Sequence, residues 1–298
     1  MGRTLTTISD LSAATNQAVI INVGTKLVAT LALMSALRYA AMPVLLIDCE
    51  SADGSLEHFT NLQQAYDFDL LSVPLKPHGQ TLDWIFQNIP AEHVLLIDSD
   101  LEITSSEIVL MMKDFITDDV TFGCGFVHGP YWLTDEFPYI PSGMSLYQER
   151  PYIPLTMLKT SLVREAIGSG YSFVIRSIWN DFAPSQRASL FLHRRFHHAR
   201  VRHNKLTWLN LFKESFYGHK PSLVFCDTGA DLYQFLKYKR GYEFVGYPKR
   251  FIGRYANHFD GITRRLLDPN DYNATALSSV SLQIQQRLLQ IYEIGMEA

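Results

Sequence analysis

Two aspartates directly follow an apolar segment in the first half of the chain. Residues 94–97 are Val, Leu, Leu and Ile, as expected of a strand buried on both faces, and Asp98 and Asp100 come where that strand ends. Ligands of open α/β sheets bind beyond the carboxyl ends of the strands. Two carboxylates one residue apart repel each other unless a cation lies between them, and their hard oxygens favour Mg²⁺ or Mn²⁺ that also binds nucleotide phosphates. The alternative is an acidic strand-to-loop turn, because Asp and Ser are common in turns.

Polar residues also follow two earlier apolar segments, and they indicate a nucleotide site. Gly24 would let the backbone approach a ligand closely, and Thr25 would cap the next helix. Asp48 and Asp53 follow the second segment, where carboxylates accept hydrogen bonds from a nucleobase or a ribose. Alternatively, Asp53 and its neighbours form only a turn and a helix start. The chain has neither G-x-G-x-x-G nor G-x-x-x-x-G-K-S/T, which excludes dinucleotide and P-loop sites and favours a nucleotide held through a metal.

The residues before Asp98 alternate between two apolar patterns. Short apolar runs predict strands at 19–23, 44–47, 68–73 and 94–97, and a helical spacing predicts helices at 26–40, 55–66 and 82–89. Four strands alternating with three helices indicate a parallel sheet built from right-handed crossover units. Such a sheet would bring the polar residues at the strand ends to one edge.

The pattern loosens after Asp100. The sequence predicts a strand at 121–127, a short helix at 158–167, a helix at 227–240 ending at Gly241, and an amphipathic helix in the last 20 residues. That last helix either docks on the body or mediates self-association. Residues 129–154 carry five prolines without a clear period, and we expect a functional loop or lid there. The basic run at 193–205 is expected to be a solvated face, with an anionic acceptor or a membrane surface as alternatives.

Composition narrows the class of protein. The chain has 298 residues, 47% hydrophobic and 19% charged, which is enough for a sizeable core. A net charge of −4 provides no global field that would attract nucleic acid. Three widely spaced cysteines suggest a reducing compartment and no disulfide framework. No segment has the character of a signal peptide or a spanning helix, so we expect a cytoplasmic protein, with peripheral contact at the inner membrane face left open.

Two motifs resemble those of a known group of enzymes. Asp98-Ser99-Asp100 after an apolar strand resembles the metal motif of glycosyltransferases with the A-type (GT-A) fold. Residues 48–55 resemble the D-(D/N)-x-S-x-D-G-S/T pattern of the family 2-like nucleotide-diphospho-sugar transferases, which include cellulose and chondroitin synthases, and Cys49 departs from it. The resemblance implies an α/β fold: a three-layer α/β/α sandwich with a mainly parallel central sheet. Its expected parts, in a single domain over 1–298, are a donor half (1–120), an acceptor half (121–270) and a C-terminal helical tail (271–298).

The resemblance also implies roles for individual residues. The metal ligands would be Asp98, Asp100 and His258, binding Mn²⁺ or Mg²⁺. The donor nucleotide would contact Val23, Gly24, Thr25, Asp48, Asp53 and Ser99, and its diphosphate Arg264 or Arg265. Asp227 would be the general base, with Asp231, Asp135 and Glu136 in reserve. Independently of the resemblance, Tyr131 and Trp132 are candidate platforms for an acceptor sugar, or else core residues. Packing and helix capping are the alternatives for His258 and Asp227.

The sequence therefore predicts a metal-dependent glycosyltransferase, and inversion is implied by the resemblance alone. Its donor would be a nucleotide-diphosphate sugar, with UDP favoured, and its acceptor a glycan or a lipid-linked acceptor, in a setting such as polysaccharide assembly. A sugar-phosphate nucleotidyltransferase and a catalytically silent nucleotide-sugar-binding or assembly subunit stay open as alternatives, as does a homodimer. A haloacid-dehalogenase-type phosphatase is disfavoured, because Glu102 stands where that class has Thr or Val.

Overall fold

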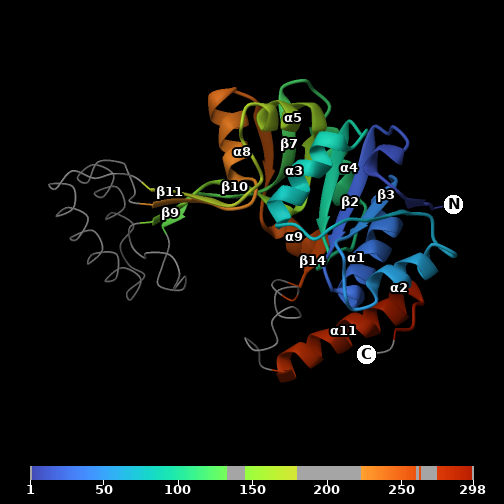
Figure 1. The fold of residues 1–298 in the computed structure, drawn as a ribbon. Coiled ribbons are helices and arrows are strands. Elements are labelled where there is room, and N and C mark those ends of the chain that lie inside the picture. Colours follow the sequence, from blue (N-terminus) through green and yellow to red (C-terminus); the bar gives the residue numbers. More distant parts are fainter. Residues whose placement is uncertain (1, 133–144, 180–222, 260–261, 263–273, 297–298) are drawn as a thin grey trace, which may run out of the picture.

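The computed structural model describes residues 2–132, 145–179, 223–259, 262 and 274–296 (Figure 1). Its centre is an eight-stranded sheet in the order β1-β4-β3-β2-β5-β10-β7-β13. The strands are β1 (Thr4–Leu5), β2 (Asn16–Asn22), β3 (Val44–Asp48), β4 (Asp69–Ser72), β5 (His93–Asp98), β7 (Thr121–His128), β10 (Arg150–Lys159) and β13 (Glu243–Tyr247). Neighbouring strands are parallel except where β10 pairs with β5 and with β7.

Helices cover both faces of this sheet. One face carries α1 (Lys26–Tyr39), α2 (Ser55–Leu62), α4 (Glu107–Phe115) and α9 (Arg250–Tyr255), and the other carries α3 (His78–Asn88), α5 (Thr160–Gly168) and α8 (Ala230–Gln234). Alternate residues of the central strands enter the two cores: Ile20 and Leu46 the first, Val19 and Leu45 the second. The predicted three-layer α/β/α architecture with a mainly parallel sheet is confirmed.

The first half of the chain folds as its periodicity predicts. Each strand and helix expected between residues 19 and 98 is present, with ends shifted by a few residues. Helix α1 is buried on two sides, because Ala29 and Leu33 pack on the sheet while Val28 and Leu31 contact the C-terminal helix. This double packing explains why α1 reads as largely apolar in the sequence.

The second half departs from prediction around β10. This strand lies in the middle of the sheet, where we expected an irregular loop over 129–154 and a helix from Leu158. Both expectations are wrong for the residues of β10, and α5 begins only at Thr160. The strand was not predicted because it contains Pro151 and Pro154. Prolines cannot donate to the hydrogen-bond ladder, so they argue against a central strand. The structure accommodates them where the register between β10 and β7 shifts.

Two small sheets lie outside the main one. An antiparallel ribbon pairs β6 (Leu101–Ile103) with β14 (Ala256–His258). A second sheet has the order β11 (Arg176–Trp179), β12 (Leu223–Cys226), β9 (Ser145–Tyr147) and β8 (Tyr131–Trp132). The helix predicted at 227–240 is the short α8 followed by a π-helical turn over Phe235–Lys239. It stops before Gly241, whose φ of 76° suits the predicted helix end.

The C-terminal helix α11 (Ala274–Tyr292) lies alongside α1 (Figure 1). Its buried Ile284 and Leu288 belong to one apolar cluster with Val28 of α1. Of the two roles left open for this helix, docking on the body is therefore observed. Leu282 and Leu289 of the predicted apolar face are 54% and 60% exposed. Among the described residues, no helix combines the length and apolarity needed to cross a membrane.

Candidate metal and donor site

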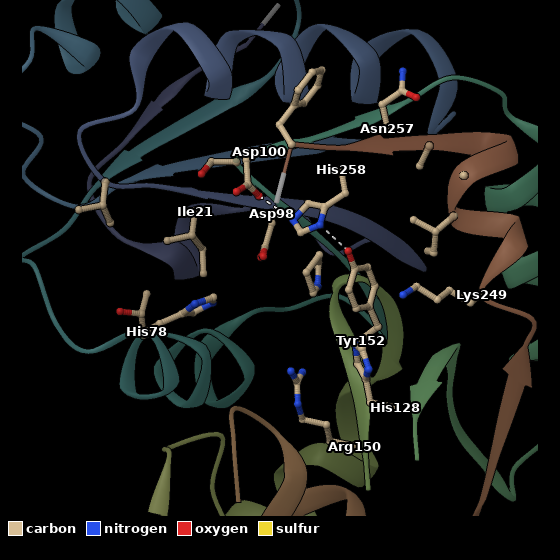
Figure 2. Close-up of a pocket in the computed structure, with 18 of the residues that line it drawn as sticks. Ile21, His78, Asp98, Asp100, His128, Arg150, Tyr152, Lys249, Asn257 and His258 are labelled. Atoms are coloured by element: carbon tan, nitrogen blue, oxygen red, sulfur yellow. Dashed lines mark hydrogen bonds and ion pairs between the residues drawn. The ribbon is translucent and has the colours of Figure 1, made fainter. Parts of the chain in front are cut away.

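The structure brings the three predicted metal ligands together, and they are called the triad below. Asp98 ends β5, Asp100 follows it, and His258 ends β14 (Figure 2). The β6–β14 ribbon places His258 there, because His258 pairs with Leu101 and the amide of Phe259 donates to the carbonyl of Asp100 at 2.9 Å. One ligand atom from each triad residue lies within 4.8 Å of the other two. Two carboxylates and one imidazole fit a divalent cation such as Mn²⁺.

The electrostatics of the triad also favour a cation. Burial raises the pKa of Asp98, and the charge of Asp100 adds to this effect, although His78, His258 and Arg150 act against it. A bound dication would offset both the burial of Asp98 and its repulsion by Asp100.

Tyr152, which lies outside the triad, contacts the imidazole of His258. His258 Nε2 lies 3.1 Å from Asp100 Oδ1, and its Nδ1 lies 2.5 Å from the hydroxyl of Tyr152 on β10 (Figure 2). If Nε2 binds a metal, Nδ1 carries the proton and donates it to Tyr152 Oη, which fixes the ring tautomer. Sequence reasoning missed Tyr152, because it lies in the proline-rich segment that was expected to be irregular.

The triad lies in a cavity of about 1180 Å³, which has room for a nucleotide-sugar. Ile21, Val23, Cys49 and Ser99 line it from the strand ends of the first half. The cavity wall also contains polar side chains to which the sequence analysis gave no role. These include Lys76, His78, His128, Arg150, Tyr152, Lys249, Gln283 and Arg287. Figure 2 shows Ile21 and His78 at one end of the cavity and Lys249 at the other, with the triad between them.

The predicted donor residues divide into two groups. Val23 and Ser99 line the cavity, whereas Gly24, Thr25, Asp48 and Asp53 are not among its lining residues. Asp48 is 1% exposed. Its oxygens accept from Asn22 Nδ2 at 2.8 Å and from the amide of Ser51 at 3.1 Å.

Asp53 joins two helix starts. Its Oδ2 accepts from the amide of Lys26 at 2.9 Å, at the beginning of α1, and its Oδ1 accepts from Ser55 Oγ at 2.5 Å, at the beginning of α2. Burial alone would raise the pKa of Asp53, but the hydrogen bonds from Ser55 and Lys26 outweigh it and lower that pKa. This geometry agrees with the alternative of a turn and a helix start at these residues, although the helix begins at Ser55 and its N-cap position is Gly54.

The two candidate bases near α8 both pair with arginines. Asp227 precedes α8 by three residues, accepts from the hydroxyl of Tyr147, and forms an ion pair with Arg150 at 2.8 Å. Asp231 is 5% exposed and pairs with Arg176, so it is a buried carboxylate with a charged partner. Neither carboxylate lines the cavity, but Arg150 does, which places Asp227 one ion pair away from it.

Other predicted site residues lie outside the described part of the chain. These are Asp135, Glu136, Arg264, Arg265 and the basic run at 193–205. Tyr131 and Trp132 form β8, antiparallel to β9.

No protein-family model matches the chain, and none of the curated proteins matches it. Several solved structures are partly similar. A mannosyltransferase of Pyrobaculum calidifontis with GDP-mannose and Mn²⁺ is 10% identical, with a TM-score of 0.39 over 52% of this chain and 49% of that one. Glucosyl-3-phosphoglycerate synthase of Mycobacterium tuberculosis with Mn²⁺, UDP and glucosyl-3-phosphoglycerate is 13% identical, with a TM-score of 0.34 over 50% and 58%.

A third similar structure is 4-diphosphocytidyl-2C-methyl-D-erythritol synthase of Anaerococcus prevotii, 12% identical with a TM-score of 0.38 over 59% of this chain and 80% of that one. The chain thus spans only 49% and 58% of the first two proteins. At these values the similarity identifies no activity.

Proposed function

We propose that this chain is a metal-dependent glycosyltransferase that moves a sugar from a nucleotide-diphosphate donor to an acceptor hydroxyl. The observation that carries the proposal is the triad of Asp98, Asp100 and His258 inside a large cavity at the carboxyl ends of β2 and β5. A site of this kind suits a diphosphate, because a divalent cation held there would neutralise charge on the departing nucleotide.

The two ends of the cavity differ in a way that suits this reaction. We assign the nucleoside to the end with Ile21, Val23 and Cys49, where apolar side chains at and just after the ends of β2 and β3 accommodate a flat base. The sugar and the acceptor then occupy the end with Arg150 and Lys249. Lys249 is a candidate partner for the diphosphate in addition to the arginines predicted at 264 and 265.

Asp227 remains our proposed general base, and inversion remains part of the proposal. Its carboxylate is held by Tyr147 and Arg150, and Arg150 extends from it to the cavity wall. To accept the acceptor's proton, Asp227 has to exchange one of these partners for the hydroxyl that attacks the anomeric carbon.

A thermal-shift screen of UDP, GDP, CMP and dTDP, each with and without Mn²⁺, tests the donor site. We expect one nucleoside diphosphate to raise the Tm only when Mn²⁺ is present, and Asp100→Asn to remove that shift. The matched control is the same substitution at an aspartate outside the triad, Asp227→Asn. This variant should keep the shift in Tm but lose sugar transfer. No metal-dependent shift with any nucleotide would refute the proposal.

Adding nucleoside triphosphates and nucleotide-sugars to the screen, together with assays of pyrophosphate release and of sugar transfer, separates the two rivals. A sugar-phosphate nucleotidyltransferase would be stabilised by a nucleoside triphosphate and would release pyrophosphate from it. A silent binding subunit would show the metal-dependent shift with a nucleotide-sugar but would neither transfer nor hydrolyse the sugar.

A further inference from the structure

We infer that the C-terminal helix α11 is a working part of the metal site, and that Arg287 on α11 and Glu102 on β6 are positioning residues for the triad. The inference rests on the metal site of the proposed function. It adds a role for an ion pair that joins α11 to the β6–β14 ribbon, which begins directly after Asp100 and ends at His258.

Glu102 is a buried carboxylate with a full set of donors. It is 1% exposed. Arg287 holds it with two bonds, from Nε to Oε2 at 2.7 Å and from Nη2 to Oε1 at 2.8 Å. Tyr292 of α11 donates to Oε1 at 3.2 Å, and Asn257 of β14 donates to Oε2 at 2.9 Å. The carboxylate therefore connects three elements: β6, β14 and α11.

Two of these connections, those to β6 and β14, lie next to a triad residue. Glu102 lies two residues after Asp100 on one side of the ribbon. Across the ribbon it pairs with Asn257, the residue before His258. The ribbon has only three residue pairs, and a two-stranded pairing of this length is marginally stable without further support. Glu102 therefore links β6 to β14 and both strands to α11, at positions close to Asp100 and His258 in the sequence.

The helix that supplies Arg287 is itself firmly placed. Ile284 and Leu288 pack in the apolar cluster against α1, on either side of Arg287 in the sequence. Arg287 also lines the cavity, as does Gln283 one turn earlier. A docked helix therefore presents the guanidinium to Glu102 at the wall of the metal site.

Stability alone is a poor explanation for this ion pair. Buried ion pairs are often no more stabilising than apolar residues of the same size, because both charges lose their hydration. The apolar cluster already anchors α11 to α1. What the planar two-bond contact adds is a fixed orientation, which a metal site with ligands from two separate strands requires.

The test is titration of the full chain with Mn²⁺ alone, by isothermal titration calorimetry, together with a Tm for each variant. Arg287→Met is expected to weaken Mn²⁺ binding about 10- to 100-fold, the usual range for residues that orient metal ligands. Arg287→Lys should lose less, because it keeps the charge but not the planar contact. Arg38→Met is the matched control: Arg38 on α1 donates to the carbonyl of Ile291 on α11 at 2.8 Å without touching Glu102.

We expect Arg38→Met to lower the Tm and to change Mn²⁺ affinity by less than about twofold. If Arg287→Met lowers the Tm but binds Mn²⁺ as the natural chain does, the pair is only structural and the inference is overturned. If Arg287→Met does not fold, Glu102→Gln is titrated with Mn²⁺ instead. Weaker Mn²⁺ binding then supports the inference, and unchanged binding overturns it. A natural chain that binds no Mn²⁺ would overturn the metal site and this inference together, so the two failures are distinguishable.

Discussion

Removing the hydroxyl of Tyr152 tests directly whether this group orients His258 for metal binding. The Tyr152 hydroxyl lies 2.5 Å from His258 Nδ1, while the opposite nitrogen of the ring faces Asp100 at 3.1 Å. Tyr152→Phe keeps the ring but removes this partner of Nδ1 at a partly buried site. An unpaired polar group of this kind costs about 1–3 kcal/mol. If the metal-bound state bears that cost, Mn²⁺ affinity falls roughly 5- to 150-fold.

The assay is calorimetric titration with Mn²⁺, and the chain offers a matched control. The hydroxyl of Tyr247 on β13 donates to the carbonyl of Leu155 at 3.2 Å, and Tyr247 does not line the cavity. Tyr247→Phe therefore loses a buried hydrogen bond too, and should lower the Tm while leaving Mn²⁺ affinity unchanged within about twofold. Equal Mn²⁺ affinities for Tyr152→Phe and the natural chain would show that the hydroxyl does not orient the ligand.

Two further predictions concern stability. Leu288→Ala should lower the free energy of unfolding by about 2–5 kcal/mol in urea titrations, because Leu288 is 0% exposed between α11 and α1. Its neighbour Leu289 is 60% exposed, so Leu289→Ala should change it by less than about 0.5 kcal/mol, and equal losses would contradict the docking of α11. Because hydrogen bonds outweigh burial and lower the pKa of Asp53 in the folded chain, its stabilisation is present above the unfolded pKa and is lost as pH falls through the folded one. Urea titrations between about pH 5 and pH 2 should therefore show the advantage of the natural chain over Asp53→Asn shrinking with acid, and a constant difference would refute this.

Local pattern was sufficient where the periodicity of a segment reports its own environment. Each strand predicted before residue 98 is a short apolar run and each helix has a helical spacing, even though β5 pairs with β2, which lies far earlier in the chain. The strand β10 was missed because it is stabilised by antiparallel neighbours, β5 and β7, that tolerate its prolines at a shift in register. Nothing in residues 150–159 alone reveals those neighbours.

The same limit applies to the site. Asp100 and His258 lie 158 residues apart, and their meeting depends on the pairing of β6 with β14. One local signal was available but was used for another purpose. Glu102 stands between Leu101 and Ile103, and a charge within an apolar segment implies a buried partner. The sequence does not say that the partner is Arg287 on the last helix.

Two segments with the same sequence show most clearly what local pattern does not predict, because their aspartates have different surroundings. Residues 44–48 and 94–98 both read Val-Leu-Leu-Ile-Asp, so no local rule distinguishes Asp48 from Asp98. Their neighbours on β2 do: Asp48 pairs with Asn22, whose amide binds it, whereas Asp98 pairs with Ile21, which has no polar group to offer. β3 and β4 extend the sheet to one side of β2, and β5 begins the other side, which is where a crevice opens in sheets of this type. The order of the strands thus gives Asp48 a hydrogen-bonding partner on β2 and leaves Asp98 at the wall of the cavity, where we propose that it binds the metal.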